Sequence, residues 1–382
     1  MAISFTEIPA ALRVPGSYHE ISNRLAGSSS DMKVVLIIAA LSAVQEKAGT
    51  TALYKPLRIL SSEDAKKNLG EGQGYQIVKD LLDVNDTLEV HALPVPKDYS
   101  GKDFAKDVWP NLTDFEFQWL LYPGSDTAQI TAIQTELEDR YKGNRQIGAR
   151  CFYAKADTAA NLLSYAEGRN SPHMVLLPLL SSENTDAARL KWLSRWTAAI
   201  TKQLAIDPSS SLNQIKVKGL SSVEQFPFST RNQFLYGGLS TWIAARDGSV
   251  YVERVVTNYT KTPEGTADSS YLDVQIPETL DAIRKYQNAE IRKRFAGTKL
   301  GPDTLIVQPG QNVLTPALLT GFLLGLYRSA FVGNKLWCVN PEKYKGSLRV
   351  ELDQNDKNTI IWYDQPELIG RFDVAKGLSE FK

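Results

Sequence analysis

The stretch that decides the fold is FQWLLYPGSDTAQITAIQTELEDRYKGNRQIGARCFYA, residues 117–154. Its apolar run from Phe117 to Tyr122 is typical of a buried strand, and the Pro-Gly-Ser turn after it leads to a helix capped by Ser125 or Asp126. The apolar face of this helix is formed by Ile130, Ile133, Leu137 and Tyr141, which recur at helical spacing. Residues Ala149 to Ala154 then predict a second strand. The stretch therefore predicts a strand, a helix and a strand in succession.

The same alternation continues on both sides of this stretch. Toward the C-terminus it predicts a helix from about Asp157 to Glu167, a strand from Met174 to Leu180 and a helix from about Thr185 to Leu204. On the N-terminal side, Val34 to Ala40 is an apolar run typical of a strand buried on both faces, and Glu63 to Leu82 carries helical signals. Repeated strand and helix alternation implies a parallel sheet with right-handed crossovers. This part is an α/β fold.

The last third of the chain has a different pattern. Gly238 to Asn258 predicts two strands joined at Arg246-Asp247-Gly248, a hairpin turn. Helices are predicted from about Pro277 to Phe295 and from Pro316 to Phe331. Three further segments are strand-like: Ser347 to Leu352, Thr359 to Tyr363 and Arg371 to Leu378. This part reads as α+β, with an extended C-terminal end.

Composition shifts and turn residues suggest a multi-domain organisation with two extended arms. The first thirty residues contain scattered apolar side chains, too few and too dispersed to form a core of their own. The sequence Gly27-Ser28-Ser29-Ser30 that follows them is typical of a flexible linker. Turn chemistry between residues 94 and 101 suggests another junction. The predicted parts are an N-terminal arm at 1–30, an α/β segment of the core at 31–96, an α/β domain with parallel strands at 97–225, a C-terminal α+β domain at 226–365 and a C-terminal arm at 366–382.

Composition limits the classes of partner. The 382 residues hold 43 basic and 43 acidic side chains, so no overall field favours nucleic acid or an anionic membrane. The N-terminus lacks the basic start and apolar region of a signal peptide, and the apolar segment from Val313 to Val332 is interrupted as in a buried amphipathic helix, so we expect no membrane insertion. The two cysteines, Cys151 and Cys338, form no metal-binding pair and fit a reducing cytoplasm.

Candidate chemistry is sparse, and we expect no catalytic, cofactor-binding or metal-binding residues and no cofactor. His19, His91 and His173 lie outside any metal-ligand pattern. The cluster Gly70-Glu-Gly72-Gln-Gly74 follows a helical stretch instead of a strand, so we interpret it as a helix C-cap and a turn into the next helix, not as a phosphate loop. An α/β enzyme or ligand-binding protein of unknown substrate remains the alternative, because α/β folds often carry active sites.

The helix predicted at 277–295 carries the strongest cluster of charge. Its cations are Arg284, Lys285, Arg292, Lys293 and Arg294. Glu278, Asp281 and Glu290 dilute them, so a solvated helix face is one reading. Contact with an acidic surface of a partner protein is the other. Aromatic residues are not interleaved with the cations as a nucleic-acid platform requires.

Short motifs along the chain carry a resemblance to a known family. The first are Ile8-Pro9-Ala10 and Leu12-Arg13-Val14-Pro15-Gly16, followed by Tyr18 and Glu20. Others are Arg145-Gln146-Ile147-Gly148, Gly168-Arg169-Asn170 with Pro172-His173, Leu204-Ala205-Ile206-Asp207-Pro208, Phe228 with Arg231-Asn232, Gly238-Leu239-Ser240-Thr241, Arg246-Asp247-Gly248, Glu253-Arg254 and Ser270-Tyr271-Leu272-Asp273-Val274. Their joint order over most of the chain resembles the Mu-like contractile phage tail sheath proteins.

The resemblance implies a structural subunit that polymerises helically around a tail tube and contracts to drive the tube through a target cell envelope. It implies partners as well: further copies of the chain, the tube protein, and baseplate and tail terminator proteins, in a virion tail assembled in the host cytoplasm. The arms would add strands to neighbouring subunits through Phe5, Ile8, Leu12, Val14, Tyr18, Ile21, Phe372, Val374, Leu378 and Phe381. The five cations of the basic helix are candidates for contact with the tube. Mu-like sheath proteins are often longer, so an outer domain is reduced here.

Overall fold

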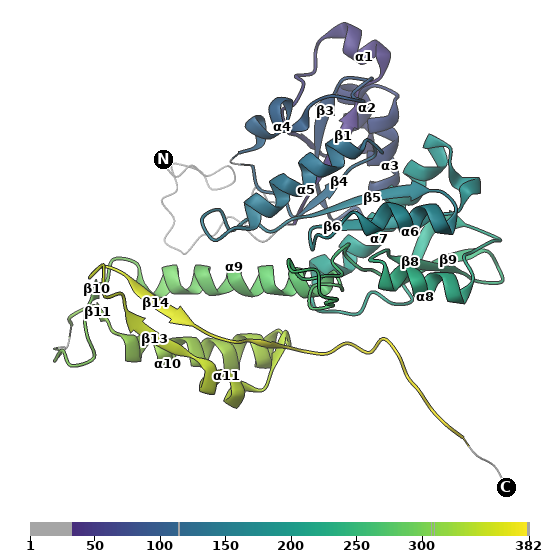
Figure 1. Cartoon of the computed structure of the whole chain (residues 1–382). Helices are drawn as coiled ribbons and strands as arrows, with labels where there is room; N and C mark the ends of the chain where they lie inside the picture. The colour runs from purple at the N-terminus through teal and green to yellow at the C-terminus, as the bar shows by residue number, and fades with distance from the viewer. Residues whose placement is uncertain (1–32, 114, 307, 309, 380–382) are drawn as a thin grey trace, which may run out of the picture.

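The computed structural model describes residues 33–379 except 114, 307 and 309. Its centre is a six-stranded sheet (Figure 1). The strands lie in the order β2 (Leu57–Ile59), β3 (Glu89–Val95), β1 (Val34–Ala40), β4 (Trp119–Leu121), β5 (Arg150–Ala156) and β6 (Met174–Leu179). All neighbouring pairs are parallel except β2 with β3. The predicted parallel α/β sheet is confirmed.

Helices pack on both faces of this sheet, and its central strands are therefore buried on both sides. The helices are α1 (Ala43–Ala48), α2 (Ser62–Leu69), α3 (Gln73–Val84), α4 (Phe104–Asp107), α5 (Thr127–Tyr141), α6 (Ala159–Glu167) and α7 (Asp186–Ile206), with short 3-10 turns at Trp109–Leu112 and Ser181–Glu183. Along β1, Val35, Ile37 and Ala39 join the core beneath α2, α3 and α7. The alternate residues Leu36, Ile38 and Ala40 join the core beneath α4, α5 and α6.

A small antiparallel sheet extends the same two cores. It consists of β7 (Lys216–Ser221), β9 (Ser249–Arg254) and β8 (Thr241–Ala244), and α8 (Phe228–Tyr236) precedes β8. The predicted hairpin is β8 and β9. Trp242 and Val252 belong to one core and Phe234 to the other.

Hydrogen-bonded strand pairs cross two of the predicted domain boundaries. Residues 31–96 and 97–225 do not form separate units, because β4 pairs directly with β1 and their hydrogen bonds close one sheet. Residue 226 does not begin a new unit either, because β7 on one side pairs with β9 on the other. The core changes instead along α9 (Gln275–Phe295): Val274 packs in the first core and Ile283 in a third.

The third core lies between α9 and the elements that follow it. These are β10 (Lys299–Leu300), β11 (Val313–Leu314), α10 (Pro316–Leu326), a π-helix (Tyr327–Asn334), β12 (Cys338–Val339), α11 (Pro341–Ser347), β13 (Arg349–Leu352), β14 (Ile360–Tyr363) and β15 (Glu367–Leu368). Figure 1 shows this part beneath α9, opposite the large sheet. By length and composition alone, Pro316–Asn334 would be able to cross a membrane. One of its faces, with Leu319, Leu323 and Tyr327, is buried in the third core.

Candidate functional site

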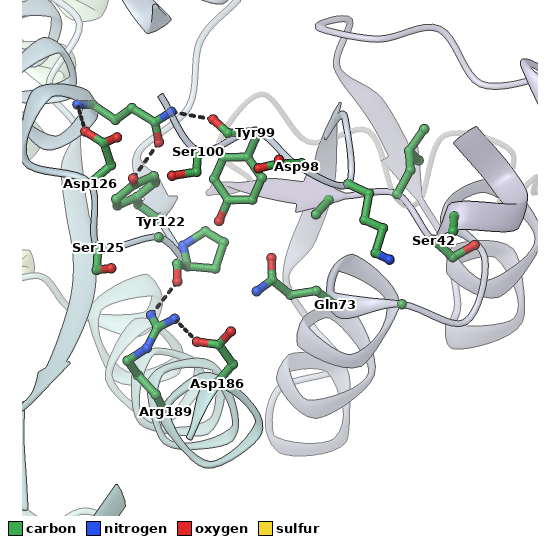
Figure 2. A pocket seen from close by; sticks show the side chains of 18 of the residues that line it. Ser42, Gln73, Asp98, Tyr99, Ser100, Tyr122, Ser125, Asp126, Asp186 and Arg189 are labelled. Atoms are coloured by element: carbon green, nitrogen blue, oxygen red, sulfur yellow. Dashed lines mark hydrogen bonds and ion pairs between the residues drawn. The ribbon is translucent and has the colours of Figure 1, made fainter. Parts of the chain in front are cut away.

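A cavity lies where the strand order of the sheet reverses. Its volume is about 600 Å³, and it lies between Leu41, just after β1, and Pro123, just after β4 (Figure 2). The chain runs from β1 outward to β3 and then crosses back to β4 on the other side of β1. Such switch points are the usual ligand sites of open α/β sheets, so this cavity is where the ligand-binding alternative must be tested.

Several polar side chains around the cavity hold the neighbouring loops together. The Tyr122 hydroxyl donates to Gln129 Oε1 at 2.6 Å, and Gln129 Nε2 donates to the Tyr99 carbonyl oxygen at 2.6 Å. Arg189 donates to the Pro123 carbonyl oxygen and, at 2.8 Å, to Asp186 Oδ1. Burial raises the pKa of the Tyr99 and Tyr122 hydroxyls, so both stay protonated near neutral pH and cannot act as bases. The arrangement is that of a braced loop.

The glycine cluster borders the same cavity, and close packing accounts for it. Gly70 ends α2 with φ +71°, and its N–H donates to the Lys66 carbonyl oxygen. A Cβ on Gly70 would lie 2.0 Å from Ser42 Oγ, and one on Gly74 would lie 2.9 Å from the Ala40 carbonyl oxygen. The interpretation as a helix C-cap followed by a turn into α3 is confirmed.

The described histidines and cysteines serve the packing. His173 is buried, and burial together with the Arg150 charge lowers its pKa to about 3, so it is neutral. His91 contacts Glu89 at 3.1 Å, and both cysteines are buried free thiols. Within residues 33–379, apart from the three omitted, no group of three or more His, Cys, Asp or Glu side chains could hold a metal ion.

The five cations proposed for a partner contact do not form one surface. Arg284 faces inward: its guanidinium donates to the Tyr141 carbonyl oxygen at 2.9 Å and to Asp281 Oδ1 at 2.9 Å, and it lies over the Tyr141 ring. Lys285 is exposed and lies 4.0 Å from Glu116. The other three, Arg292, Lys293 and Arg294, are exposed together in the last turn of α9. This last group is the one cluster of exposed cations among the five.

A buried ionic network that sequence reasoning missed joins α9 to the sheet. The fully buried Arg150, at the start of β5, contacts Asp281 Oδ2 at 2.6 Å and Glu278 Oε1 at 3.8 Å. Trp119 of β4 donates its Nε1–H to Glu278 Oε1 at 3.2 Å. Burial raises the pKa of Glu278, and the Arg150 charge opposes that rise. Because β4 and β5 begin here, the network fixes α9 beneath the amino ends of the strands.

Gly148 makes the close approach of α9 possible. A Cβ at this position would lie 1.8 Å from Asp281 Oδ2, so any larger residue would displace the carboxylate that Arg150 binds. The sequence held a weak signal for the network, since Arg150 interrupts a run of strand residues. It held no signal for the partners, which lie 128 and 131 positions further along the chain.

The C-terminal segment leaves the third core as an exposed extended chain. Its root is fixed by the pairing of β15 with β12 and by the Ile369 N–H, which donates to the Trp337 carbonyl oxygen at 3.0 Å. Beyond it, Phe372, Val374 and Leu378 are 78%, 67% and 87% exposed. Residues 369–379 form no strand within the single chain, and Figure 1 shows them running away from the body.

A two-stranded sheet of the third core is open on both edges. β13 pairs with β14, and in the part of the chain that the structure describes neither strand pairs with a third. Val350 and Ile360 pack against the third core, while Ile361, Trp362 and Tyr363 are 42%, 39% and 57% exposed. Phe5, Ile8, Leu12, Val14, Tyr18, Ile21 and Phe381, the other residues predicted to link subunits, lie outside the described residues.

One curated relative matches the sequence. The Mu-like prophage FluMu tail sheath protein of Haemophilus influenzae is 27% identical over 305 residues, which cover 74% of this chain and 61% of that protein. The chain therefore spans about three fifths of the length of this relative. No family model matches the chain.

Solved structures share the fold. The sheath tail protein of Desulfitobacterium hafniense aligns with a TM-score of 0.55 and 10% identity, over 93% of this chain and 100% of that one. The sheath tail protein of Listeria innocua aligns with a TM-score of 0.52 and 11% identity, over 88% and 95%. The helical sheath of the anti-feeding prophage in its contracted state aligns with a TM-score of 0.57 and 12% identity, over 97% and 99%. The sequence is thus similar to that of a Mu-like prophage tail sheath protein, and the structure has the fold of solved tail sheath proteins.

Proposed function

We propose that the chain is the structural subunit of a contractile tail sheath, which polymerises helically around a tail tube and shortens to drive the tube through a target cell envelope. The observation that carries the proposal is an exposed, extended apolar segment in a chain that also has a sheet with open edges. Phe372, Val374 and Leu378 are separated by two and four positions, so an extended strand would present all three on one face. Fully burying each of these side chains contributes about 1.5–3 kcal/mol.

The β13–β14 sheet is the acceptor that fits this strand. Added to an open edge of a second copy, the arm would pair its backbone groups and cover apolar side chains at once. The same donor and acceptor on every copy make a contact that repeats without closing, and such a contact generates a helix. The linked subunits can then rotate during contraction without dissociating. The N-terminal residues 1–30 supply a second arm in this proposal.

The chain works as a mechanical part and not as an enzyme in this proposal, since the Tyr122 hydroxyl, the Gln129 amide and the Arg189 guanidinium at the cavity are engaged in bracing its loops. Contraction releases free energy stored in a metastable extended lattice, and the chain consumes no nucleotide or cofactor. Its partners are the tube protein, a baseplate and a tail terminator. It acts in a virion tail that is assembled in the host cytoplasm, with no nucleic acid contact and no direct membrane insertion.

The tube contact is assigned to the exposed cations at the end of α9. Arg292, Lys293 and Arg294 lie in the last turn of α9, where the helix dipole also favours positive charge. Within the single chain, their role is to stabilise the end of the helix. An acidic tube surface would use the same three charges through their long exposed side chains. Arg284 is left out of the contact because it binds Tyr141 and Asp281 within the chain.

Electron microscopy of the purified chain, alone and with its tube protein, tests the proposal. We expect hollow striated cylinders from the full chain. A variant that ends at Arg371 should remain a folded monomer, whereas one that ends at Ser379 keeps the exposed apolar strand and should retain more assembly. Compact particles from the full chain at every concentration would contradict the sheath proposal. Cylinders from the chain ending at Arg371 would contradict the role of the C-terminal arm.

A further inference from the structure

Asp273 lies where three parts of the molecule meet. It comes just before α9 and forms an isolated bridge with Val256, next to β9. Its Oδ1 accepts from Arg254 Nε at 2.8 Å. Its Oδ2 accepts from Arg254 Nη2 at 3.0 Å and from Arg371 Nη2 at 2.9 Å. One carboxylate thus joins the small sheet, the head of α9 and the root of the C-terminal arm.

This contact is shielded from solvent, unlike the arm beyond it. The side chains of Asp273 and Arg371 are each 12% exposed, and Arg254 is 31% exposed. The next residue, Phe372, is 78% exposed. Asp373 adds a second negative charge that acts on Arg254. The arm is therefore held at Arg371, stays near Arg254 at Asp373 and is exposed from Val374 onward.

An ion pair is a costly way to add stability at such a position. Partial burial removes water from both charges, and the Arg371 Nε is buried without a partner in the described part of the chain. A guanidinium group bound to a fixed carboxylate instead determines the orientation of the chain that carries it, because the N–H donors of the planar guanidinium meet the carboxylate oxygens in a narrow range of geometries. The pairing thus orients the chain at the point where it leaves the body.

We propose that Asp273 and Arg371 form an arm clamp, which sets the point and the direction from which the C-terminal arm reaches a second copy of this chain. This proposal rests on the sheath function above. From the clamp, residues 372–382 span at most about 40 Å, so the acceptor edge of the second copy must lie within that distance of Asp273. Release of the clamp frees Gly370 and Arg371 as well and lengthens the reach by about 7 Å.

The clamp also determines where assembly forces act. The arm belongs in sequence to the third core, but it is fastened at the head of α9, next to the small sheet that shares the cores of the large unit. A pull from a neighbouring copy is therefore delivered to Asp273, which joins both parts of the subunit. Without the clamp, the same pull would act on the short β12–β15 pair.

Hydrogen exchange on monomers, followed by electron microscopy, tests the clamp in two separate steps. The variants are Arg371→Gln, Arg371→Lys and Asp273→Asn, and the matched control is Lys376→Gln, an exposed arm residue beyond the clamp. In monomers of Arg371→Gln, we expect the Ile369 amide to exchange about tenfold faster or more, with the core amides unchanged, and the control to match the original chain. In Arg371→Lys, the exchange rate of the Ile369 amide should lie between those of Arg371→Gln and the original chain, because lysine keeps the positive charge and lacks the planar guanidinium.

In polymers, Arg371→Gln should give cylinders with variable helical repeat, or shorter ones, while Lys376→Gln gives uniform cylinders. Unchanged exchange at Ile369 in every variant would overturn the clamp. Faster exchange together with uniform cylinders would overturn its role in directing the arm. A full chain that never polymerises, even though the variants show the expected exchange, would remove the sheath function while the clamp itself remained.

Discussion

Replacing Arg150 with Met removes the cation at the centre of the buried network and is the sharpest test of how α9 is held. Asp281 keeps a partner in Arg284, at 2.9 Å. Glu278, only 3% exposed, keeps the Trp119 N–H and loses the nearby positive charge. A buried carboxylate left without its cation costs about 3–5 kcal/mol. We therefore expect Arg150→Met to lower the free energy of unfolding by that amount near neutral pH.

The loss should depend on pH in a defined direction. Burial already raises the pKa of Glu278 above its ordinary value near 4.5, and removing Arg150 raises the pKa further. A carboxyl group with a raised folded-state pKa is protonated in the folded chain at pH values where the unfolded chain is ionised. The folded state therefore gains stability relative to the unfolded state as the pH falls through this window, and the penalty in Arg150→Met should shrink as the pH is lowered from neutral toward the ordinary value near 4.5.

Urea unfolding followed by far-UV circular dichroism at several pH values measures the effect. The double variant Arg150→Met with Glu278→Gln should recover part of the lost stability, because it removes the unpaired charge. Arg58→Met is the matched control: its side chain is 49% exposed and lies 3.4 Å from Glu89, so its loss should cost less than about 1 kcal/mol. A loss below about 1 kcal/mol in Arg150→Met, or one that does not change with pH, would refute the reasoning.

Three further outcomes are expected. Changing Phe372, Val374 and Leu378 together to Ser should leave the Tm of the monomer unchanged and abolish cylinders in electron microscopy, while Lys376→Gln assembles; normal assembly would exclude a packed arm. Arg292→Glu with Lys293→Glu should weaken co-sedimentation with the tube protein by about tenfold or more at low salt, whereas Lys47→Glu with Lys67→Glu should not; equal effects would indicate only net charge. Gly148→Ala should lower unfolding stability by about 1–3 kcal/mol, and Gly143→Ala, where a Cβ meets nothing within 4 Å, should change it little; equal losses would remove the close approach of Asp281 as the cause.

Local patterns predicted most of the elements because each pattern depends on near neighbours. The apolar run at β1, the glycine stop after α2 and the turn between β8 and β9 were all predicted correctly, and of the two candidates for the cap of α5, Ser125 and Asp126, the structure shows Asp126. Each of these is set by backbone conformation or by side-chain spacing within about one turn or one strand. Local patterns do not show contacts between distant segments: the turn residues at 94–101 mark a loop and do not reveal that β1 pairs with β4.

The sequence by itself thus determined the α/β pattern, the exposed character of the C-terminal arm and the resemblance to tail sheath proteins. Only the tertiary structure decided which charged side chains are exposed and which form ion pairs or hydrogen bonds within the chain. It placed Arg284 inside the chain and Arg292 outside, though both belong to one helix, and it brought Asp281 to Arg150 and Asp273 to Arg371. The reason is physical: an ion pair between residues about a hundred positions apart is made by the packing of whole elements, and no local pattern of residues encodes it.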